Sequence, residues 1–135
     1  MLATEEPLVL VFFGDHKPWL GNSGSVYETL GINIDPSTEA GFFNYYATRY
    51  LILANDAAKA LCGNDFLGEG EPISVSFLMN KVFELCGYPG SAYMQFTSSV
   101  MQSSPVIHRT SDRTEETARL FDAVSYYYRR NFAYD

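Results

Sequence analysis

The stretch LVLVFFGDHKPWLG, which covers residues 8–21, decides the fold that the sequence predicts. Its first six residues, 8–13, are apolar, and a glycine, an aspartate and a histidine follow them directly. A continuous run of valine, leucine and phenylalanine between a proline and a glycine is typical of a β-strand that is buried on both faces, as in parallel α/β sheets. We therefore predict such a strand at residues 8–13, in an α/β fold.

Two residues that can bind a metal ion, Asp15 and His16, follow this strand behind Gly14. Binding sites in open α/β sheets lie beyond the carboxyl ends of the strands, so the predicted strand would bring both side chains to that edge. Gly14 would adopt an unusual backbone angle that lets both turn toward one point. A carboxylate oxygen and an imidazole nitrogen are good ligands of Zn²⁺ and Mn²⁺. Because two ligands hold a metal poorly, the alternative is an aspartate that caps a turn beside a surface histidine.

The rest of the chain predicts a few-stranded sheet flanked by helices. Apolar spacing, capping serines and helix-ending glycines indicate where the elements lie. They are a short helix from Ser25 to Gly31, a strand at residues 48–54, and helices at residues 74–86, 91–102 and 112–130. Residues 17–47 are otherwise expected to be mostly loop and residues 57–72 to be irregular, because both segments carry several glycines.

The composition is that of a single globular domain, residues 1–135. Hydrophobic residues make up 47% of the chain, which is enough to bury a core. The net charge of −7 and the absence of a basic patch argue against binding to nucleic acid. No apolar run approaches the roughly 20 residues of a membrane span, and no signal peptide is recognised, so we expect this chain itself to be soluble. Cys62 and Cys86 could pair or stay free, and buried free thiols are the stronger expectation.

Three further residues are candidate substrate contacts: Lys17, Trp19 and His108. His108 is the second of two histidines and could also be a third metal ligand; the alternative is a solvated loop residue. Trp19, together with Tyr45 and Tyr46, could form the floor of a pocket, although packing in the core or a loop is the commoner role of such residues. Lys17 directly follows the aspartate and histidine, where it would bear on substrate preference.

Four segments of the chain resemble, in the same order, the sulfatase-like catalytic domain of proteins of the lipoteichoic acid synthase type, in the alkaline phosphatase superfamily. They are LVLVFFGDHKPWLG, ATRYLILAND, ISVSFLMNKVFELCGYPGSAYMQF and LFDAVSYYYRRNFAY. The resemblance covers residues 7–134, and GDH is its most specific part. Two positions beside the motif differ from the family: Lys17 stands where a leucine is usual, and Arg49 stands where a proline is common.

The resemblance implies a partial alkaline-phosphatase-like or sulfatase-like fold in an enzyme that transfers or hydrolyses phosphate or sulfate esters. Some members of the family transfer glycerophosphate. The resemblance also implies a divalent cation, Mn²⁺ first, with Zn²⁺, Mg²⁺ or Ca²⁺ as alternatives. Asp15 and His16 would hold it together with a glutamate and a nucleophilic threonine, and the cation would polarise the phosphoryl oxygen and activate the attacking hydroxyl.

In that family the glutamate and the threonine lie far upstream of GDH. We therefore expect the chain to be the C-terminal segment of a larger catalytic domain and to be inactive alone. The resemblance further implies a full-length parent that is anchored to a membrane, with its catalytic domain outside the cytoplasm.

Two other hypotheses stay open. The chain could be a non-catalytic α/β module that binds a partner or forms a homo-oligomer through an exposed sheet edge. It could also be a complete small hydrolase, in which Asp15, His16 and His108 bind the metal and a bound water is the nucleophile.

Overall fold

A computed structural model describes residues 4–107 and 116–132. The chain divides into two compact units, residues 8–53 and residues 1–7 with 54–135. We call the first the hairpin unit and the second the helical unit. The predicted single domain over residues 1–135 stays a prediction.

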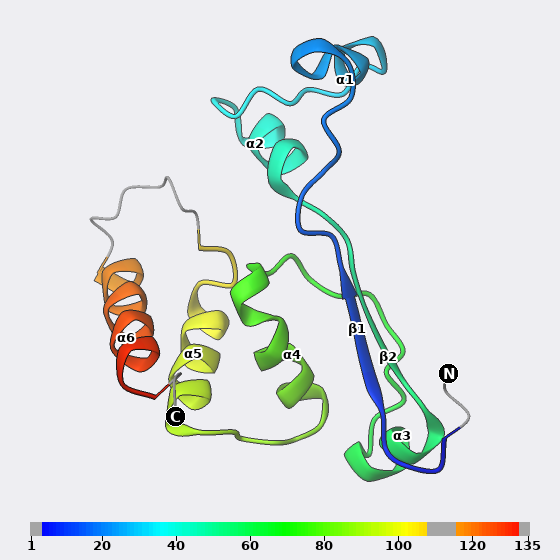
Figure 1. Cartoon of the computed structure of the whole chain (residues 1–135), viewed down its shortest axis with the longest axis vertical. Helices are drawn as coiled ribbons and strands as arrows, with labels where there is room; N and C mark the ends of the chain where they lie inside the picture. The colour runs from blue at the N-terminus through cyan, green and yellow to red at the C-terminus, as the bar shows by residue number, and fades with distance from the viewer. Residues whose placement is uncertain (1–3, 108–115, 133–135) are drawn as a thin grey trace. The chain divides into compact units, whose positions relative to one another are not determined.

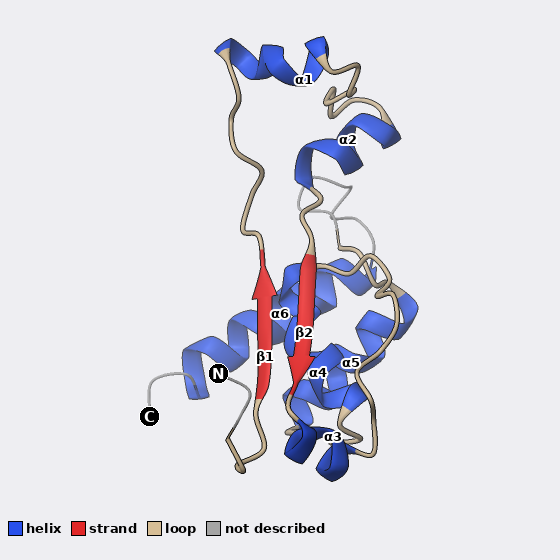
Figure 2. Ribbon diagram, turned by 90° about the vertical axis from the view of Figure 1, so that its right-hand side faces the viewer, coloured by secondary structure: helices blue, strands red, loops and turns tan. Residues whose placement is uncertain are grey.

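The hairpin unit contains a two-stranded sheet in which β1 (Val9–Phe13) pairs with β2 (Tyr50–Ala54). The last residue of β2 is also the first residue of the longer segment of the helical unit. Figure 2 shows that the strands run in opposite directions. The structure therefore confirms two strands close to the predicted places in a mixed α/β chain, but the prediction of a parallel sheet is wrong. An apolar run predicts extended backbone, whereas the direction of the neighbouring strand depends on how the long connection returns.

The prediction that β1 is buried on both faces is also wrong. Its first three residues are half-buried, but Phe12 and Phe13 are 53% and 52% exposed. Within the described residues β1 has a single neighbouring strand, so its apolar side chains are covered only in part. The continuous apolar run of residues 8–13 therefore predicts the strand correctly but does not predict that its side chains are buried.

The connection between the strands forms two short helices, α1 (Ser25–Thr29) and α2 (Glu39–Tyr46), with a 3₁₀ turn at Asn22–Gly24 before α1. The prediction of α1 is confirmed, although its N-cap is a left-handed glycine, Gly24, and not a capping serine. The expectation of loop is wrong at α2. Thr38 caps α2 by accepting a hydrogen bond from the backbone N–H of Gly41 at 3.1 Å.

The helical unit contains four α-helices in its described residues. They are α3 (Asp56–Cys62), α4 (Leu78–Leu85, preceded by a 3₁₀ turn at Val75–Phe77), α5 (Ala92–Ser103) and α6 (Glu116–Phe132). The predictions of α4, α5 and α6 are confirmed, although residues 112–115 of the last predicted helix lie outside the described residues. Figure 1 shows α5 beside both α4 and α6, and these helices contact each other in that order. None of the described helices combines the length and the apolar character needed to cross a bilayer.

The expectation of irregular chain at residues 57–72 is wrong at α3. Asn55 is 3% exposed and caps α3, because its Oδ1 accepts from the N–H of Ala58 at 2.9 Å. Its Nδ2 donates to the carbonyl oxygens of Thr4 and Glu6 at 2.9 and 2.7 Å. One asparagine thus starts the helix and fixes the segment before β1 to it.

The core of the helical unit lies where the 3₁₀ turn before α4 meets α5 and α6. Phe77 is fully buried and packs with Val100 and Met101. Phe121 of α6 meets Phe77 edge to face, with ring centroids 5.4 Å apart. These residues come from three segments, so their burial holds the helices together.

A buried amide joins α4 to α5. Asn80 is 1% exposed, and its Nδ2 lies 3.0 Å from Met94 O, 2.8 Å from Thr97 Oγ1 and 2.9 Å from Ser98 Oγ. An amide nitrogen with two hydrogens can be fully satisfied by such a set of acceptors. The contact is therefore a specific polar link inside an apolar interface.

We predict that Asn80→Ala lowers the free energy of unfolding by about 2 kcal/mol, because it leaves buried acceptors without their donor and opens a void. Urea unfolding followed by far-UV circular dichroism measures the change. Asn131→Ala is the matched control, since among the described residues that exposed amide donates only to Tyr127 O of its own helix, and it should cost no more than about 0.5 kcal/mol. An equal decrease in the free energy of unfolding in the two variants would contradict the role of Asn80 as a stabilising link between α4 and α5.

Candidate functional site

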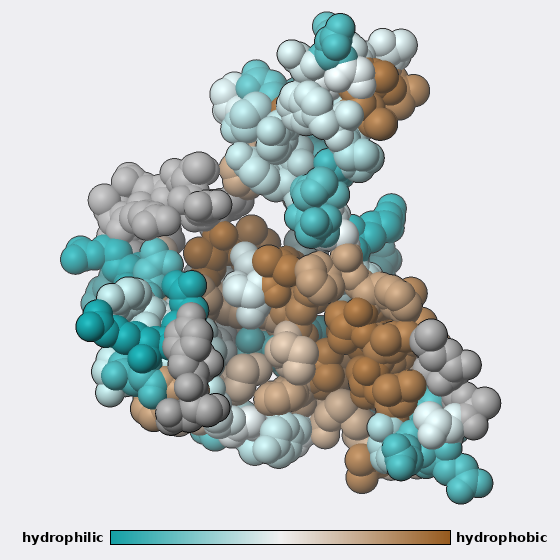
Figure 3. Space-filling view, in the orientation of Figure 1, coloured by the Kyte–Doolittle hydropathy of each residue, from teal (hydrophilic) through white to brown (hydrophobic). Residues whose placement is uncertain are grey.

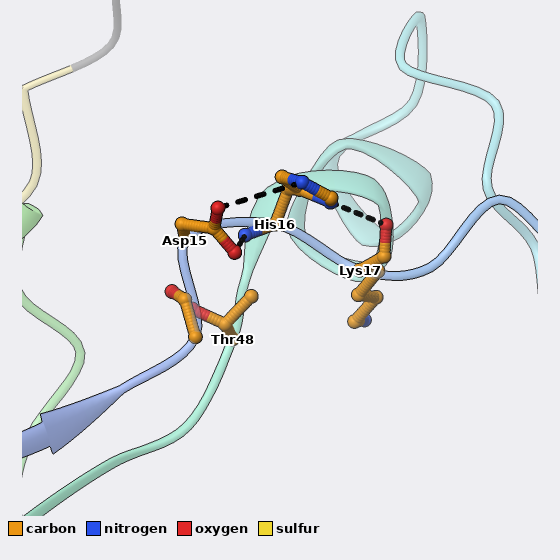
Figure 4. A network of polar contacts seen from close by, with 5 residues as sticks. Asp15, His16, Lys17 and Thr48 are labelled. Carbon is orange, nitrogen blue, oxygen red and sulfur yellow. Dashed lines mark hydrogen bonds and ion pairs between the residues drawn. The ribbon is translucent and has the colours of Figure 1, made fainter.

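Asp15 and His16 lie directly after β1, at the end of the sheet where β2 begins, and their side chains face each other (Figure 4). The backbone N–H of His16 donates to Asp15 Oδ1 at 2.9 Å, which orients the carboxylate. The other carboxylate oxygen, Oδ2, lies 3.5 Å from His16 Nε2. Both side chains are open to solvent, 81% exposed for Asp15 and 77% for His16. The structure therefore brings this predicted pair together on an accessible surface.

The neighbours of the imidazole ring indicate where its proton lies. His16 Nδ1 is 3.1 Å from the carbonyl oxygen of Lys17. The neighbour of each ring nitrogen, Lys17 O for Nδ1 and Asp15 Oδ2 for Nε2, can only accept a hydrogen bond, and we assign the single hydrogen of the neutral ring to Nδ1 because its contact of 3.1 Å is shorter than the 3.5 Å at Nε2. In the neutral ring, Nε2 then carries a lone pair and lies 3.5 Å from Asp15 Oδ2. Two acceptors in this arrangement repel each other unless a cation joins them, either a second proton on the ring or a metal ion.

The arrangement fits one half of a metal site. A histidine that binds a metal usually donates its other ring N–H to a carbonyl or carboxylate, as His16 does to Lys17 O. Ligands at about 2.0–2.1 Å from a tetrahedral ion lie roughly 3.3 Å apart, which is close to the 3.5 Å seen between Oδ2 and Nε2. Across residues 4–107 and 116–132, however, no three histidine, cysteine, aspartate or glutamate side chains come together in a group that could hold a metal.

The backbone beneath the pair is fixed by Gly14 and Thr48. Thr48 Oγ1 donates to Gly14 O at 2.6 Å, and Gly14 N–H donates to Arg49 O at 3.1 Å. A Cβ on Gly14 would lie only 3.0 Å from Thr48 Cβ, so the glycine permits this close approach. The expectation of an unusual backbone angle is wrong, because Gly14 is not among the residues with positive φ. The glycine serves chain packing and not a left-handed turn.

The two other predicted site residues that the structure describes contact α2. The Lys17 ammonium donates a hydrogen bond to Asn44 O, and Figure 4 shows its side chain pointing away from the His16 ring. Trp19 is 59% exposed and meets Tyr45 edge to face, with ring centroids 6.0 Å apart. His108 lies outside the described residues. Lys17 and Trp19 therefore fasten the segment after the pair to α2, and their roles as substrate contacts stay predictions.

Sequence reasoning overlooked Thr48 as a part of this site. The only signal for it in the sequence was its place near the start of ATRYLILAND, the second of the four segments that resemble the family. The hydrogen bond from Thr48 to Gly14 forms because β2 pairs with β1 in the antiparallel direction. The pattern of apolar residues does not predict that direction.

Comparisons of the chain with protein-family models, with curated proteins and with solved structures each found no match.

We predict that Thr48→Val lowers the free energy of unfolding by about 1 kcal/mol, because the variant keeps the shape of the side chain but loses the hydrogen bond to Gly14. Thr29→Val is the control, since within the part of the chain that the structure describes the exposed Thr29 hydroxyl donates only to Ser25 O of its own helix. Chemical denaturation of both variants tests this. If Thr48→Val is as stable as the unmodified chain, the hydroxyl does not hold the ends of the strands together.

Proposed function

We propose that this chain is the C-terminal part of a metal-dependent transferase or hydrolase of phosphate or sulfate esters, of the lipoteichoic acid synthase type. In this proposal Asp15 and His16 provide two ligands of a divalent cation, Mn²⁺ by resemblance. The order of the four similar segments supports it. The observation that carries it is the pair of facing acceptor atoms, Asp15 Oδ2 and His16 Nε2, which are 3.5 Å apart.

Each residue of the pair has a separate task in this proposal. The His16 N–H holds Asp15 Oδ1, so Oδ2 is left to bind and its negative charge offsets that of a cation. The Lys17 carbonyl keeps the proton of the ring on Nδ1, so Nε2 is left as the ligand atom. A divalent cation bound there would polarise the oxygen of the ester. Because Asp15 and His16 are strongly exposed, an ester could approach from solvent.

The same geometry favours a chain that is inactive alone. Two ligands do not complete a metal site, and the described residues add no third one to the pair. By resemblance, the glutamate and the nucleophilic threonine belong to a segment upstream of GDH. The proposal therefore places the reaction in a longer catalytic domain, whose parent protein is anchored to a membrane and acts outside the cytoplasm.

We predict measurable Zn²⁺ and Mn²⁺ binding by the chain that is lost in the double variant Asp15→Asn/His16→Gln. Isothermal titration calorimetry measures the binding. Asp65→Asn is the control, because it removes one exposed carboxylate elsewhere and should leave the affinity unchanged. Equal heats from the unmodified chain and the double variant would exclude the pair as a metal site.

With either metal, hydrolysis of p-nitrophenyl phosphate by the chain should stay at the level of the double variant, since the proposal assigns the nucleophile to a segment upstream of GDH. Activity above that level would overturn the proposal of an incomplete site. If His16→Ala abolished such activity, the complete small hydrolase would become the better account.

A second function, self-association by a non-catalytic module, is favoured by the apolar surface of the strands. Phe12, Phe13 and Leu51 are each more than half exposed. Figure 3 shows hydrophobic residues gathered over β1 and β2. In the described part of the chain the sheet has two strands, so each has an outer edge that can pair with another chain.

We predict that the chain forms dimers or larger assemblies at high concentration, and that Phe13→Lys weakens them. Light scattering over a concentration series measures the assembly. Leu61→Lys is the control, because Leu61 is 75% exposed but lies on α3 and not in the sheet. A monomer at every concentration would exclude this second function.

A further inference from the structure

Both short helices of the hairpin unit contact residues 17–19, which directly follow the candidate metal pair. Lys17 and Trp19 contact α2, as described above. The contact from α1 is made by Tyr27, which is half-buried and whose hydroxyl donates to Pro18 O at 2.6 Å. Proline has no backbone N–H, so this carbonyl is the polar group through which the backbone of Pro18 can be held.

The ring of Tyr27 is itself fixed by packing over Gly24. A Cβ added to Gly24, which is buried, would lie 2.7 Å from Ile34 Cδ1, 3.8 Å from Tyr27 Cδ2 and 3.9 Å from Trp19 Cη2. Three side chains therefore close over one glycine. The packing orients the tyrosine ring and, with it, the hydroxyl that reaches Pro18.

The backbone between Pro18 O and Lys17 O is stiff. The peptide bond that joins the two residues is trans and planar. The proline ring fixes its own φ at about −65°, and a residue that precedes a proline is restricted to extended conformations. A contact that holds Pro18 O therefore also limits where the carbonyl oxygen of Lys17 can lie.

The Lys17 carbonyl is the group that orients the His16 ring. Figure 4 shows the ring between the Asp15 carboxylate and Lys17 O, which lies 3.1 Å from Nδ1. The acceptor belongs to the backbone, so no substitution of the Lys17 side chain removes it. Its position depends instead on the side chains that hold the surrounding backbone.

We propose that Tyr27 is a positioning residue of the candidate metal site. Through Pro18 O it keeps the Lys17 carbonyl against His16 Nδ1, so that the hydrogen of the ring stays on Nδ1 and Nε2 faces the cation. This inference rests on the proposed function, in which Asp15 and His16 bind a divalent cation. It adds that the segment between the strands, which includes α1, tunes the affinity of that site.

The test compares the unmodified chain with Tyr27→Phe, which keeps the packed ring and loses only the hydroxyl. Long-range ¹H–¹⁵N NMR spectra at mildly alkaline pH report which ring nitrogen of His16 carries the hydrogen. We expect part of the hydrogen to move from Nδ1 to Nε2 in the variant. Calorimetry with Zn²⁺ should show binding weakened about three- to tenfold, less than the roughly 10–100-fold that follows the loss of a group in direct contact with a ligand.

Two controls separate positioning from general stability. Tyr88→Phe makes the same chemical change at a tyrosine of the helical unit that is 59% exposed. Thr29→Val removes a hydroxyl from α1 that donates to Ser25 O of the same helix and not to Pro18. Neither control should change the ring spectrum or the zinc affinity.

The outcomes distinguish this inference from the proposed function. If the unmodified chain binds zinc and Tyr27→Phe leaves the ring spectrum or the affinity unchanged, the positioning role is overturned and the metal site stands. Equal changes in Thr29→Val and Tyr27→Phe would also overturn it. Equal zinc heats from the unmodified chain and Asp15→Asn/His16→Gln would instead overturn the proposed function, and the ring spectrum of Tyr27→Phe would then decide by itself whether Tyr27 positions His16.

Discussion

The pairing of β1 with β2 is the constraint on which the candidate site depends. The pairing continues past the strands through the bonds of Gly14 to Arg49 and Thr48. Because both the N–H and the carbonyl oxygen of Gly14 are hydrogen-bonded, the backbone that carries Asp15 and His16 is held in place. Lys17 then fastens the chain to α2 through Asn44 O. Asp15 and His16 are thus exposed side chains on a backbone that is tied before and after them.

Sequence patterns predicted the elements whose signals are local. The apolar runs gave both strands to within two residues, and apolar spacing with helix-ending glycines gave α4 and α5. The helix α3 was overlooked because the glycines of residues 57–72 were interpreted as a sign of irregular chain, although the asparagine before them, Asn55, is a common N-cap residue. The antiparallel direction was not predictable from these patterns, since it depends on the path of the whole connection between the strands.

The candidate site shows the same limit. The sequence makes Asp15 and His16 neighbours, so their proximity was predictable. The facing of Oδ2 and Nε2 was not, because it depends on two backbone bonds, from His16 N–H and to Lys17 O. Lys17 looked like a substrate contact beside the motif, yet its ammonium reaches a carbonyl of α2 that lies far along the sequence. The long side chain of a lysine can reach many partners, and its position beside a motif in the sequence does not predict which of them it binds.

The central claim is that His16 presents an unprotonated Nε2 beside Asp15 Oδ2. Long-range ¹H–¹⁵N NMR spectra of the ring nitrogens, recorded at mildly alkaline pH before and during addition of Zn²⁺, test it most directly. His16→Gln assigns the signals, because the chain has only two histidines. The account predicts a neutral ring with its hydrogen on Nδ1 and a change at Nε2 when zinc is added. A hydrogen on Nε2 and no response to zinc would contradict it.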